Sequence, residues 1–372
     1  MLSKEEIQRY ARHLSLSEFG TEGQEKLKSA KVLVIGAGGL GCPALLYLTA
    51  AGVGEIGVVD FDKVDVSNLQ RQILYSVEDI GSSKAESAAK KLSLQNPFVK
   101  FNVHNLKLDN TNALEIFRSY DVIIDGSDNF ATRYLVNDAC VLLNKPLVYG
   151  SIFKFEGQAS VFNYKNGSTY RCVFPDPPSP DSSPSCSEIG VLGVLPGIIG
   201  TIQATEAIKI ITGLGETLSG RLLLFDALTM NFNSVIVTRS EESLNASPKT
   251  EDEFLKTDYE YFCESKTTNT KLKSISVNEL QLLIEKKENI QIVDVREMNE
   301  HPKLEELTDL QIPLSQLPRG AELINKNKII VYCQSGTRSK RAITLLQNVF
   351  PEKEFYNLEG GINEWMNAFE LK

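Results

Sequence analysis

Paired cysteines, histidines and positive charge are all scarce in this sequence of 372 residues. The six cysteines lie so far apart that none belongs to a CxxC pair, which excludes a disulfide scaffold, a shorter and denser kind of chain. The three histidines form no cluster that predicts a metal or catalytic site. Because 39 Lys and Arg face 48 Asp and Glu, the net charge is −9, and nucleic acid is not expected as a partner.

Long uninterrupted apolar runs are also absent. The longest uncharged run, residues 32–54, has 23 residues, but six glycines and a proline divide it into a strand, a turn and a buried helix. The first residues, MLSKEEIQRYARHL, mix acidic and basic side chains and lack the apolar core of a signal peptide. We therefore expect a cytoplasmic protein with no membrane partner.

Short β-rich runs alternate with helical runs along most of the chain. This rhythm begins at residue 31 and predicts an α/β fold with a doubly wound, mostly parallel, Rossmann-like sheet. Residues 246–272 lack hydrophobic periodicity and are rich in acidic residues, as expected of a solvated linker. We therefore predict a first domain over residues 1–245, an acidic linker over 246–272 and a smaller α/β domain over 273–372.

A glycine-rich turn follows the first predicted strand. Its glycines fit the pattern G-x-G-x-x-G, at Gly36, Gly38, Gly39 and Gly41. Such glycines let the backbone approach a phosphate at the N-terminus of the next helix, and Asp60, after the following strand, could accept from a ribose hydroxyl. The motif alone predicts a dinucleotide site, as in an NAD-dependent dehydrogenase.

Three charged residues beyond this turn favour a nucleoside triphosphate instead. Arg71, Lys84 and Asp128 lie at predicted strand ends or at a predicted helix start. Two cations offset the charge of phosphates, and a carboxylate binds the hard cation Mg²⁺. A dehydrogenase has no use for this set, so ATP and Mg²⁺ are the predicted cofactors.

Ordered motifs in the first 240 residues are similar to those of one family. They are RYARH (9–13), the segment 36–72, GSSKAESA (81–88), DGSDNFATRYLVND (125–138), EGQASVF (156–162) and LLFDAL (223–228). Together they resemble the MoeB/ThiF-type adenylyltransferases of the ubiquitin-activating superfamily. The resemblance implies a homodimer that uses ATP and Mg²⁺ to adenylate the C-terminal glycine of a ubiquitin-like sulfur carrier protein ending in Gly-Gly.

The resemblance also implies roles for single residues. Arg71 and Lys84 would hold the phosphates, and Asp128 would bind Mg²⁺. Arg12 would reach the nucleotide of the partner subunit. The other residues expected at the nucleotide are Gly36, Gly38, Gly39, Gly41, Asp60, Asp62, Ser67, Asn68, Leu69, Gln70 and Asn129.

One feature of the family is missing from the sequence. Most relatives carry two CxxC pairs that bind a structural zinc ion. Thr169 and Cys172 stand where the first pair would be, and residues 240–250, where the second pair is expected, contain no cysteine. Because structural zinc takes four ligands, we expect no zinc site.

Cys333 begins a second motif, the loop CQSGTRS between a predicted strand and a helix. The backbone N–H groups of the loop, the helix dipole and Arg338 favour an anion at the sulfur and therefore a persulfide. With DVRE (294–297), IPLSQLP (312–318) and LEGGINEW (358–365), the loop resembles that of a rhodanese domain. Related phosphatases are an alternative, but they place five residues between Cys and Arg, and this loop has four.

Cys186 follows a proline-rich loop, where the family carries a cysteine that can form a thioester or disulfide with the carrier. The two resemblances together predict an adenylyltransferase with a sulfurtransferase domain. A persulfide on Cys333, charged by a donor such as a cysteine desulfurase, would displace AMP from the adenylated carrier, and Cys186 would release the thiocarboxylate.

The sequence leaves the carrier open between the small subunit of molybdopterin synthase, for molybdenum cofactor biosynthesis, and a ThiS-type protein, for thiamine biosynthesis. Two other functions remain as alternatives. One is a non-catalytic docking module for ubiquitin-like proteins, and the other is an NAD-dependent dehydrogenase.

Overall fold

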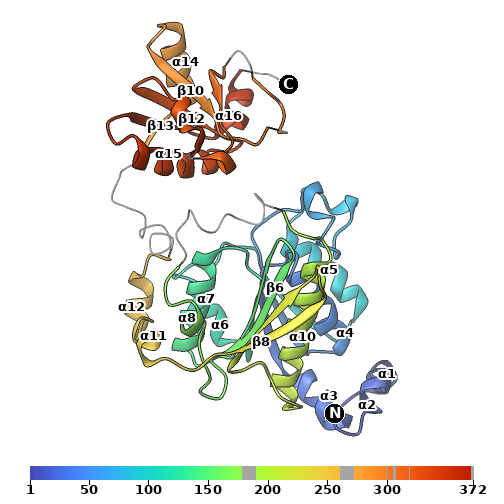
Figure 1. Ribbon diagram of the computed structural model, residues 1–372. Coiled ribbons are helices and arrows are strands. Elements are labelled where there is room, and N and C mark those ends of the chain that lie inside the picture. Colours follow the sequence, from blue (N-terminus) through green and yellow to red (C-terminus); the bar gives the residue numbers. More distant parts are fainter. Residues whose placement is uncertain (178–189, 260–271, 299, 305–306, 318, 370–372) are drawn as a thin grey trace. The chain divides into compact units, whose positions relative to one another are not determined.

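The chain forms two compact units, each built around its own β-sheet. The computed structural model describes residues 1–369 except 178–189, 260–271, 299, 305–306 and 318. The units are Met1–Lys266 and Thr267–Lys372 (Figure 1). No helix in the described ranges is both long and apolar enough to cross a membrane.

The sheet of the first unit has eight strands in the order β3-β2-β1-β4-β5-β6-β7-β8. The first five strands in this order are parallel, and the last three are antiparallel to their neighbours. The bounds are β1 Lys31–Ile35, β2 Glu55–Val59, β3 Lys100–His104, β4 Val122–Asp125, β5 Leu147–Phe153, β6 Glu156–Phe162, β7 Arg221–Asp226 and β8 Asn231–Ile236.

Helices cover both faces of this sheet (Figure 1). Their bounds are α1 Lys4–Arg9, α2 Ala11–Leu14, α3 Gly20–Ser29, α4 Gly41–Ala51, α5 Lys84–Gln95, α6 Ala113–Arg118, α7 Phe130–Leu142, α8 Tyr170–Val173, α10 Leu195–Thr212, α11 Glu241–Asn245 and α12 Glu251–Lys256.

Alternation along the central strand divides the apolar side chains between two cores. Val32 and Val34 of β1 belong to a core that includes residues of α4, α5 and α10. Leu33 and Ile35 belong to a second core that includes residues of α6 and α7. Because neighbouring side chains of a strand point to opposite faces, one β-rich run supplies both cores. The predicted doubly wound α/β sheet is confirmed.

The prediction of a solvated linker is wrong over residues 246–259. Within it, α12 carries Phe254, which is fully buried, and Tyr259 is 5% exposed. Both side chains pack into the core beneath α6 and α7. One buried aromatic in a six-residue helix produces no hydrophobic periodicity. The acidic composition of the segment therefore predicted a solvated chain, although the helix packs against the core. The rest of the expected linker, apart from residue 272, lies outside the described residues.

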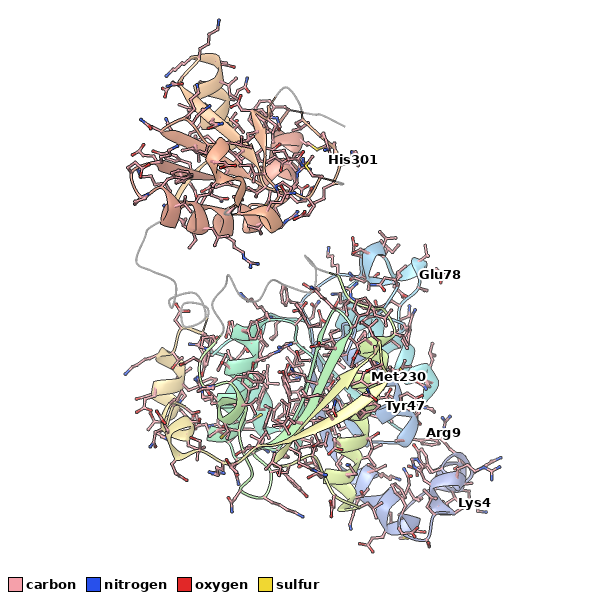
Figure 2. All side chains as sticks on the ribbon, viewed as in Figure 1. Lys4, Arg9, Tyr47, Glu78, Met230 and His301 are labelled. Carbon is pink, nitrogen blue, oxygen red and sulfur yellow. The ribbon has the colours of Figure 1, made fainter. Side chains whose placement is uncertain are left out.

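Strand β8 ends the sheet of the first unit with solvent-exposed side chains. All six of its residues are exposed, as is Met230 in the turn before it. Met230 and Tyr47 of α4 both lie on the surface of this unit (Figure 2). The edge strand therefore contributes hydrogen bonds to the sheet but few buried side chains.

The second unit is built on a smaller, fully parallel sheet. Its five strands have the order β11-β10-β12-β13-β9. Apolar residues on its two faces form separate cores. The bounds are β9 Lys273–Ile275, α14 Val277–Glu285, β10 Ile290–Asp294, β11 Leu310–Gln311, β12 Lys328–Tyr332, α15 Thr337–Val349, β13 Glu354–Leu358 and α16 Gly361–Ala368.

Candidate functional site

A pocket of about 730 Å³ opens in the first unit at the carboxyl ends of its parallel strands. The turns after β1, β2, β3 and β4 all line it. Open α/β sheets bind ligands at this edge because the turns there leave a crevice. The fold therefore brings together residues from distant parts of the sequence, from Ile35 to Tyr259.

The glycine-rich turn forms one wall of the pocket. Gly36, Gly38 and Gly39 line it, and Gly36 has a φ of 86°, which favours glycine. Gly41 does not line the pocket. A Cβ there would lie 1.9 Å from the carbonyl oxygen of Gly36, so this glycine allows α4 to start close to the turn.

Asp60 fixes the shape of this turn from the neighbouring strand. Its carboxylate accepts hydrogen bonds from the backbone N–H of Ala37 and of Asp62, both at 2.8 Å. Burial raises the pKa of Asp60, although these two hydrogen bonds oppose the rise. Asp60 also lines the pocket, where a ribose hydroxyl could reach it. The carboxylate would then hold the turn and bind the ribose at the same time.

Two cations lie on the same side of the pocket as the glycine turn. Lys84, at the start of α5, has a buried side chain, and its Nζ lies 2.9 Å from Oδ2 of Asp62. The guanidinium of Arg71 donates to the carbonyl oxygen of Ser67 at 3.0 Å. Arg71, Lys84 and Asp62 all line the pocket. This arrangement places positive charge beside backbone that can approach a phosphate.

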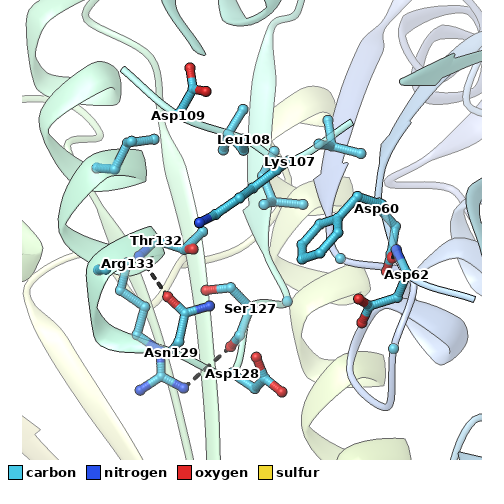
Figure 3. Close-up of a pocket in the computed structure, with 18 of the residues that line it drawn as sticks. Asp60, Asp62, Lys107, Leu108, Asp109, Ser127, Asp128, Asn129, Thr132 and Arg133 are labelled. Atoms are coloured by element: carbon cyan, nitrogen blue, oxygen red, sulfur yellow. Dashed lines mark hydrogen bonds between the residues drawn. The ribbon is translucent and has the colours of Figure 1, made fainter. Parts of the chain in front are cut away.

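The turn after β4 lies beside the glycine turn and also lines the pocket (Figure 3). Asp128 is exposed within it, and Asn129 accepts a hydrogen bond from the backbone N–H of Thr132 at 2.9 Å, so Asn129 caps α7. Arg133 donates to the carbonyl oxygen of Ser127 at 3.3 Å. An exposed carboxylate that lines the same pocket as two cations is suited to a metal–phosphate ligand.

Several predicted residues do not line this pocket. Ser67 and Asn68 lie in a short 3-10 helix, Val66–Asn68, and with Leu69 and Gln70 they lead into Arg71 without lining the pocket. Arg12 is exposed on α2 and does not line the pocket of its own chain. The structure therefore brings together nine of the predicted nucleotide residues: Gly36, Gly38, Gly39, Asp60, Asp62, Arg71, Lys84, Asp128 and Asn129.

The pocket also contains residues that sequence reasoning missed. Gln72 and Ser127 are buried, and Oε1 of Gln72 and Oγ of Ser127 have no hydrogen-bond partner among the described residues. Unpaired buried oxygens in a pocket wall are suited to a polar ligand, because leaving them unpaired costs free energy. The segments 106–110 and 255–259 complete the lining. Residues 106–110 follow strand β3 and could have been found by the strand-end argument, whereas nothing in the sequence marks 255–259.

Cys333 lies in the second unit, directly after β12. Its side chain is fully buried, and Sγ accepts a hydrogen bond from the backbone N–H of Gly336 at 3.2 Å. Gly336 has a φ of 92° and immediately precedes α15. A loop N–H and the N-terminus of a helix favour negative charge at this sulfur.

Two buried polar side chains, Ser339 and Asn357, form a hydrogen-bonded pair next to the sulfur. Oγ of Ser339 donates to Oδ1 of Asn357 at 2.6 Å and lies 3.5 Å from Sγ of Cys333. Ser339 and Asn357 are both buried. Sequence reasoning missed both residues, since Ser339 is one of several serines near the loop and Asn357 comes from β13.

Arg338, which was expected to favour an anion at the sulfur, forms a bidentate ion pair with Glu300 in the structure. Its Nη2 lies 2.7 Å from Oε2 of Glu300, and Nη1 contacts Oε1. The hydrogen bond from Arg338 holds the pKa of Glu300 below its usual value. The groups that contact Sγ of Cys333 are instead Gly336 and Ser339.

Two further cysteines, Cys42 and Cys140, are buried in the cores of the first unit. Burial raises the pKa of Cys42 to about 12 and that of Cys140 well above its usual value, so neither is a nucleophile at neutral pH. Cys186, the proposed resolving thiol, lies outside the described residues, as does Cys263.

Cys172 marks the place where the family's zinc site was expected. Its Sγ accepts hydrogen bonds from the backbone N–H of Thr169 at 3.3 Å and of Ser240 at 3.4 Å. The two segments in which zinc-binding pairs were expected therefore do meet, through a thiol and backbone N–H groups. Within the described ranges, no three His, Cys, Asp or Glu side chains are grouped so that they could hold a metal ion.

Comparison with known proteins identifies a family for each of the two units. The model of the ThiF family matches residues 10–246, and that of the rhodanese-like domain matches residues 276–368. The probable adenylyltransferase/sulfurtransferase MoeZ of Mycobacterium tuberculosis is 44% identical over 99% of this chain and 95% of its own. The adenylyltransferase and sulfurtransferase MOCS3 of Culex quinquefasciatus is 39% identical over 98% of this chain and 88% of its own. The sulfur carrier protein adenylyltransferase of Thermus thermophilus is 51% identical over 70% of this chain and 98% of its own.

Solved structures support the fold of the first unit. A crystal structure of E. coli MccB with MccA-N7isoASN has a TM-score of 0.58 at 24% identity and covers 64% of this chain and 73% of that one. At that identity the likeness shows the fold alone. The resemblances found in the motifs are confirmed by the two family matches and by relatives that extend along nearly the whole chain. The chain belongs to the ThiF family and carries a rhodanese-like domain after its ThiF domain.

Proposed function

We propose that this chain adenylates the C-terminal glycine of a ubiquitin-like sulfur carrier protein and then converts that carboxylate into a thiocarboxylate. Two arrangements carry the proposal, one for each activity. In the first unit, a single pocket is lined by the glycine turn, Arg71, Lys84 and Asp128. In the second unit, a loop places Cys333 next to the backbone N–H of Gly336 and the hydroxyl of Ser339. The names of the relatives, which include adenylyltransferase, sulfurtransferase and sulfur carrier, support the same pair of activities.

In the adenylation step, a carboxylate oxygen of the carrier attacks the α-phosphorus of ATP, and pyrophosphate leaves. Arg71 and Lys84 offset the charge of the phosphates and of the departing pyrophosphate. The glycine turn lets the phosphates approach the backbone. The product is a mixed anhydride, in which AMP is a good leaving group.

Asp128 is the proposed ligand of Mg²⁺. Its carboxylate is exposed in the pocket, and oxygen donors of this kind are the ligands that Mg²⁺ prefers. When bound, the ion would neutralise phosphate charge. Asp62, in contrast, is already paired with Lys84, which it orients.

In the sulfur step, the outer sulfur of a Cys333 persulfide attacks the acyl carbon, and AMP leaves. The acyl disulfide so formed is then cleaved by a second thiol, proposed to be Cys186, which attacks Sγ of Cys333. The S–S bond to the carrier breaks, and the carrier leaves as a thiocarboxylate. A disulfide between the two cysteines remains. A thiol reductant must reduce it to two thiols before the next cycle.

The remaining parts of the proposal concern the setting of the reaction. We propose a homodimer in which Arg12, exposed on α2, reaches the nucleotide of the partner subunit. The four described cysteines are free, which supports a reducing cytoplasm. The persulfide would come from a donor such as a cysteine desulfurase, and the carrier would belong to molybdenum cofactor or thiamine biosynthesis.

ATP–pyrophosphate exchange, measured with and without a carrier ending in Gly-Gly, tests the adenylation half. Exchange should require the carrier and should be abolished by Asp128→Ala. Asp121→Ala is the matched control, since Asp121 precedes β4 at the end of the strand away from the pocket, and its carboxylate accepts a hydrogen bond from the backbone N–H of Lys31 at 2.9 Å. Absence of exchange and of AMP in the wild type would favour the non-catalytic docking module. Binding of NADH without ATP would favour the dehydrogenase.

A further inference from the structure

The chain that leads from the first unit towards the second contributes to the nucleotide pocket. Residues 255–259, directly after α12, line it together with residues 106–110. These residues lie beyond the part of the chain that matches the ThiF family model, which ends at residue 246. The pocket wall therefore includes a segment that the ThiF match does not account for.

Specific side chains hold this segment against the pocket. Nδ2 of Asn110 donates to the carbonyl oxygens of Leu255 at 2.7 Å and Thr257 at 3.0 Å. The hydroxyl of Tyr259 donates to Oδ2 of Asp138 at 3.0 Å, in a buried contact. The segment is thus fixed at its beginning and at its end.

The anchor of Tyr259 is itself rigid. Asp138 is fully buried and forms a bidentate ion pair with Arg171, with N–O distances of 2.8 and 2.7 Å. Just before the segment, the fully buried Phe254 packs into the core with Tyr259, their ring centroids 5.7 Å apart. Such a set of contacts positions a wall rather than a loose tail.

This wall lies at the end of the pocket away from Asp128, the proposed Mg²⁺ ligand. Leu108 and Asp109 lie on the side of the pocket away from Asp128 (Figure 3), and the bonds from Asn110 place residues 255–257 beside them. Four side chains here, those of Leu106, Leu108, Leu255 and Tyr259, supply apolar surface between polar ones such as Lys107 and Asp109. Apolar walls suit a flat base, whereas Arg71 and Lys84 suit phosphates.

We propose that residues 255–259 form the nucleoside end of the ATP site, so that bound nucleotide and the start of the interdomain segment stabilise each other. The inference rests on the proposed adenylation and adds a binding element to it. Because coupling between two equilibria is reciprocal, a nucleotide that contacts the wall must hold the wall in place by the same free energy. Filling the pocket would then hold residues 255–259 in place.

Limited trypsin digestion of the full-length protein tests this coupling. The probe is a non-hydrolysable ATP analogue. The measured quantity is the rate of cleavage after Lys256, which lines the pocket. Lys249, exposed and outside the pocket lining, is the internal control. At ten times the Kd, linkage predicts cleavage after Lys256 that is about tenfold slower. Cleavage after Lys249 should not change.

A pair of asparagine variants provides a second, independent measurement. Asn110→Ala removes both bonds to the wall and should raise the Kd of the analogue about tenfold. It should raise the KM for ATP in the exchange reaction while kcat changes little, because the phosphate end is intact. Asn163→Ala is the matched control, since Asn163 also bridges two carbonyl oxygens, those of Cys140 and Lys145, both at 2.9 Å, and does not line the pocket.

The outcomes separate this inference from the proposed function. If the wild type binds the analogue but Lys256 is not protected and Asn110→Ala leaves Kd unchanged, the wall is not part of the site. The adenylation proposal would then still stand. If the wild type binds no adenine nucleotide at all, both are overturned.

Discussion

Lys84→Met separates charge at the nucleotide pocket from the stability of the fold. Lys84 starts α5 with a buried side chain, and its ammonium lies 2.9 Å from Asp62. Methionine keeps an unbranched apolar stem of similar length and removes only the charge. The account predicts a folded protein that no longer adenylates its carrier.

The two expected magnitudes are very different. Asp62 is 51% exposed, so its carboxylate stays hydrated when the lysine is removed, and the loss in unfolding free energy should be about 1 kcal/mol or less. Removing one charge that stabilises the transition state lowers kcat about 10²- to 10³-fold. ATP–pyrophosphate exchange should therefore fall by that factor while thermal unfolding changes by only a few degrees.

The same helix offers a matched control in Lys91. Its Nζ pairs with Asp79 in a partly buried contact, and it does not line the pocket. Lys91→Met should lower stability by a similar amount and leave exchange unchanged. If Lys84→Met keeps more than half of the exchange activity, or if both variants lose it equally, the role of Lys84 at the phosphates is refuted.

Three further predictions concern the second unit and the metal content. Ser339→Ala should slow sulfur transfer to the carrier without affecting exchange, because it removes the polar hydroxyl that lies 3.5 Å from the sulfur; equal transfer rates would contradict this. The pKa of Glu300 is lowered by Arg338, so their pair stabilises the fold above pH 4.5 and the effect is lost as the pH falls further. The deficit of Glu300→Gln, about 1 kcal/mol at neutral pH, should shrink below pH 4.5, measured by urea unfolding through Trp365, the chain's single tryptophan. Elemental analysis should find no stoichiometric zinc; one zinc per chain would mean that ligands besides Cys172 exist.

Local pattern was enough to predict the first sheet and one edge of its pocket. Side chains of β1, β2 and β4 point alternately to the two faces of the sheet and so belong to two cores. The turns after these strands carry the residues expected at the nucleotide. Strand-end reasoning succeeds because parallel strands present their carboxyl ends at one edge.

What local pattern could not predict depends on contacts between distant segments. Phe254 and Tyr259 pack into a core whose other buried members extend from Leu33 to Leu222, and the acidic composition around them gives no sign of it. The support of Cys333 by Ser339 and Asn357 arises only when β13 lies beside β12. The ion pair of Arg338 likewise requires Glu300 from a different loop.

Division of labour between the two sites is the central claim, and Cys333→Ala tests it most directly. With carrier, ATP, Mg²⁺ and a persulfide donor present, mass spectrometry of the carrier reports whether an oxygen of its C-terminal carboxylate has been replaced by sulfur. The account predicts that Cys333→Ala retains carrier-dependent ATP–pyrophosphate exchange at the wild-type rate and forms no thiocarboxylate. Loss of exchange in this variant, or thiocarboxylate formed at the wild-type rate, would contradict it.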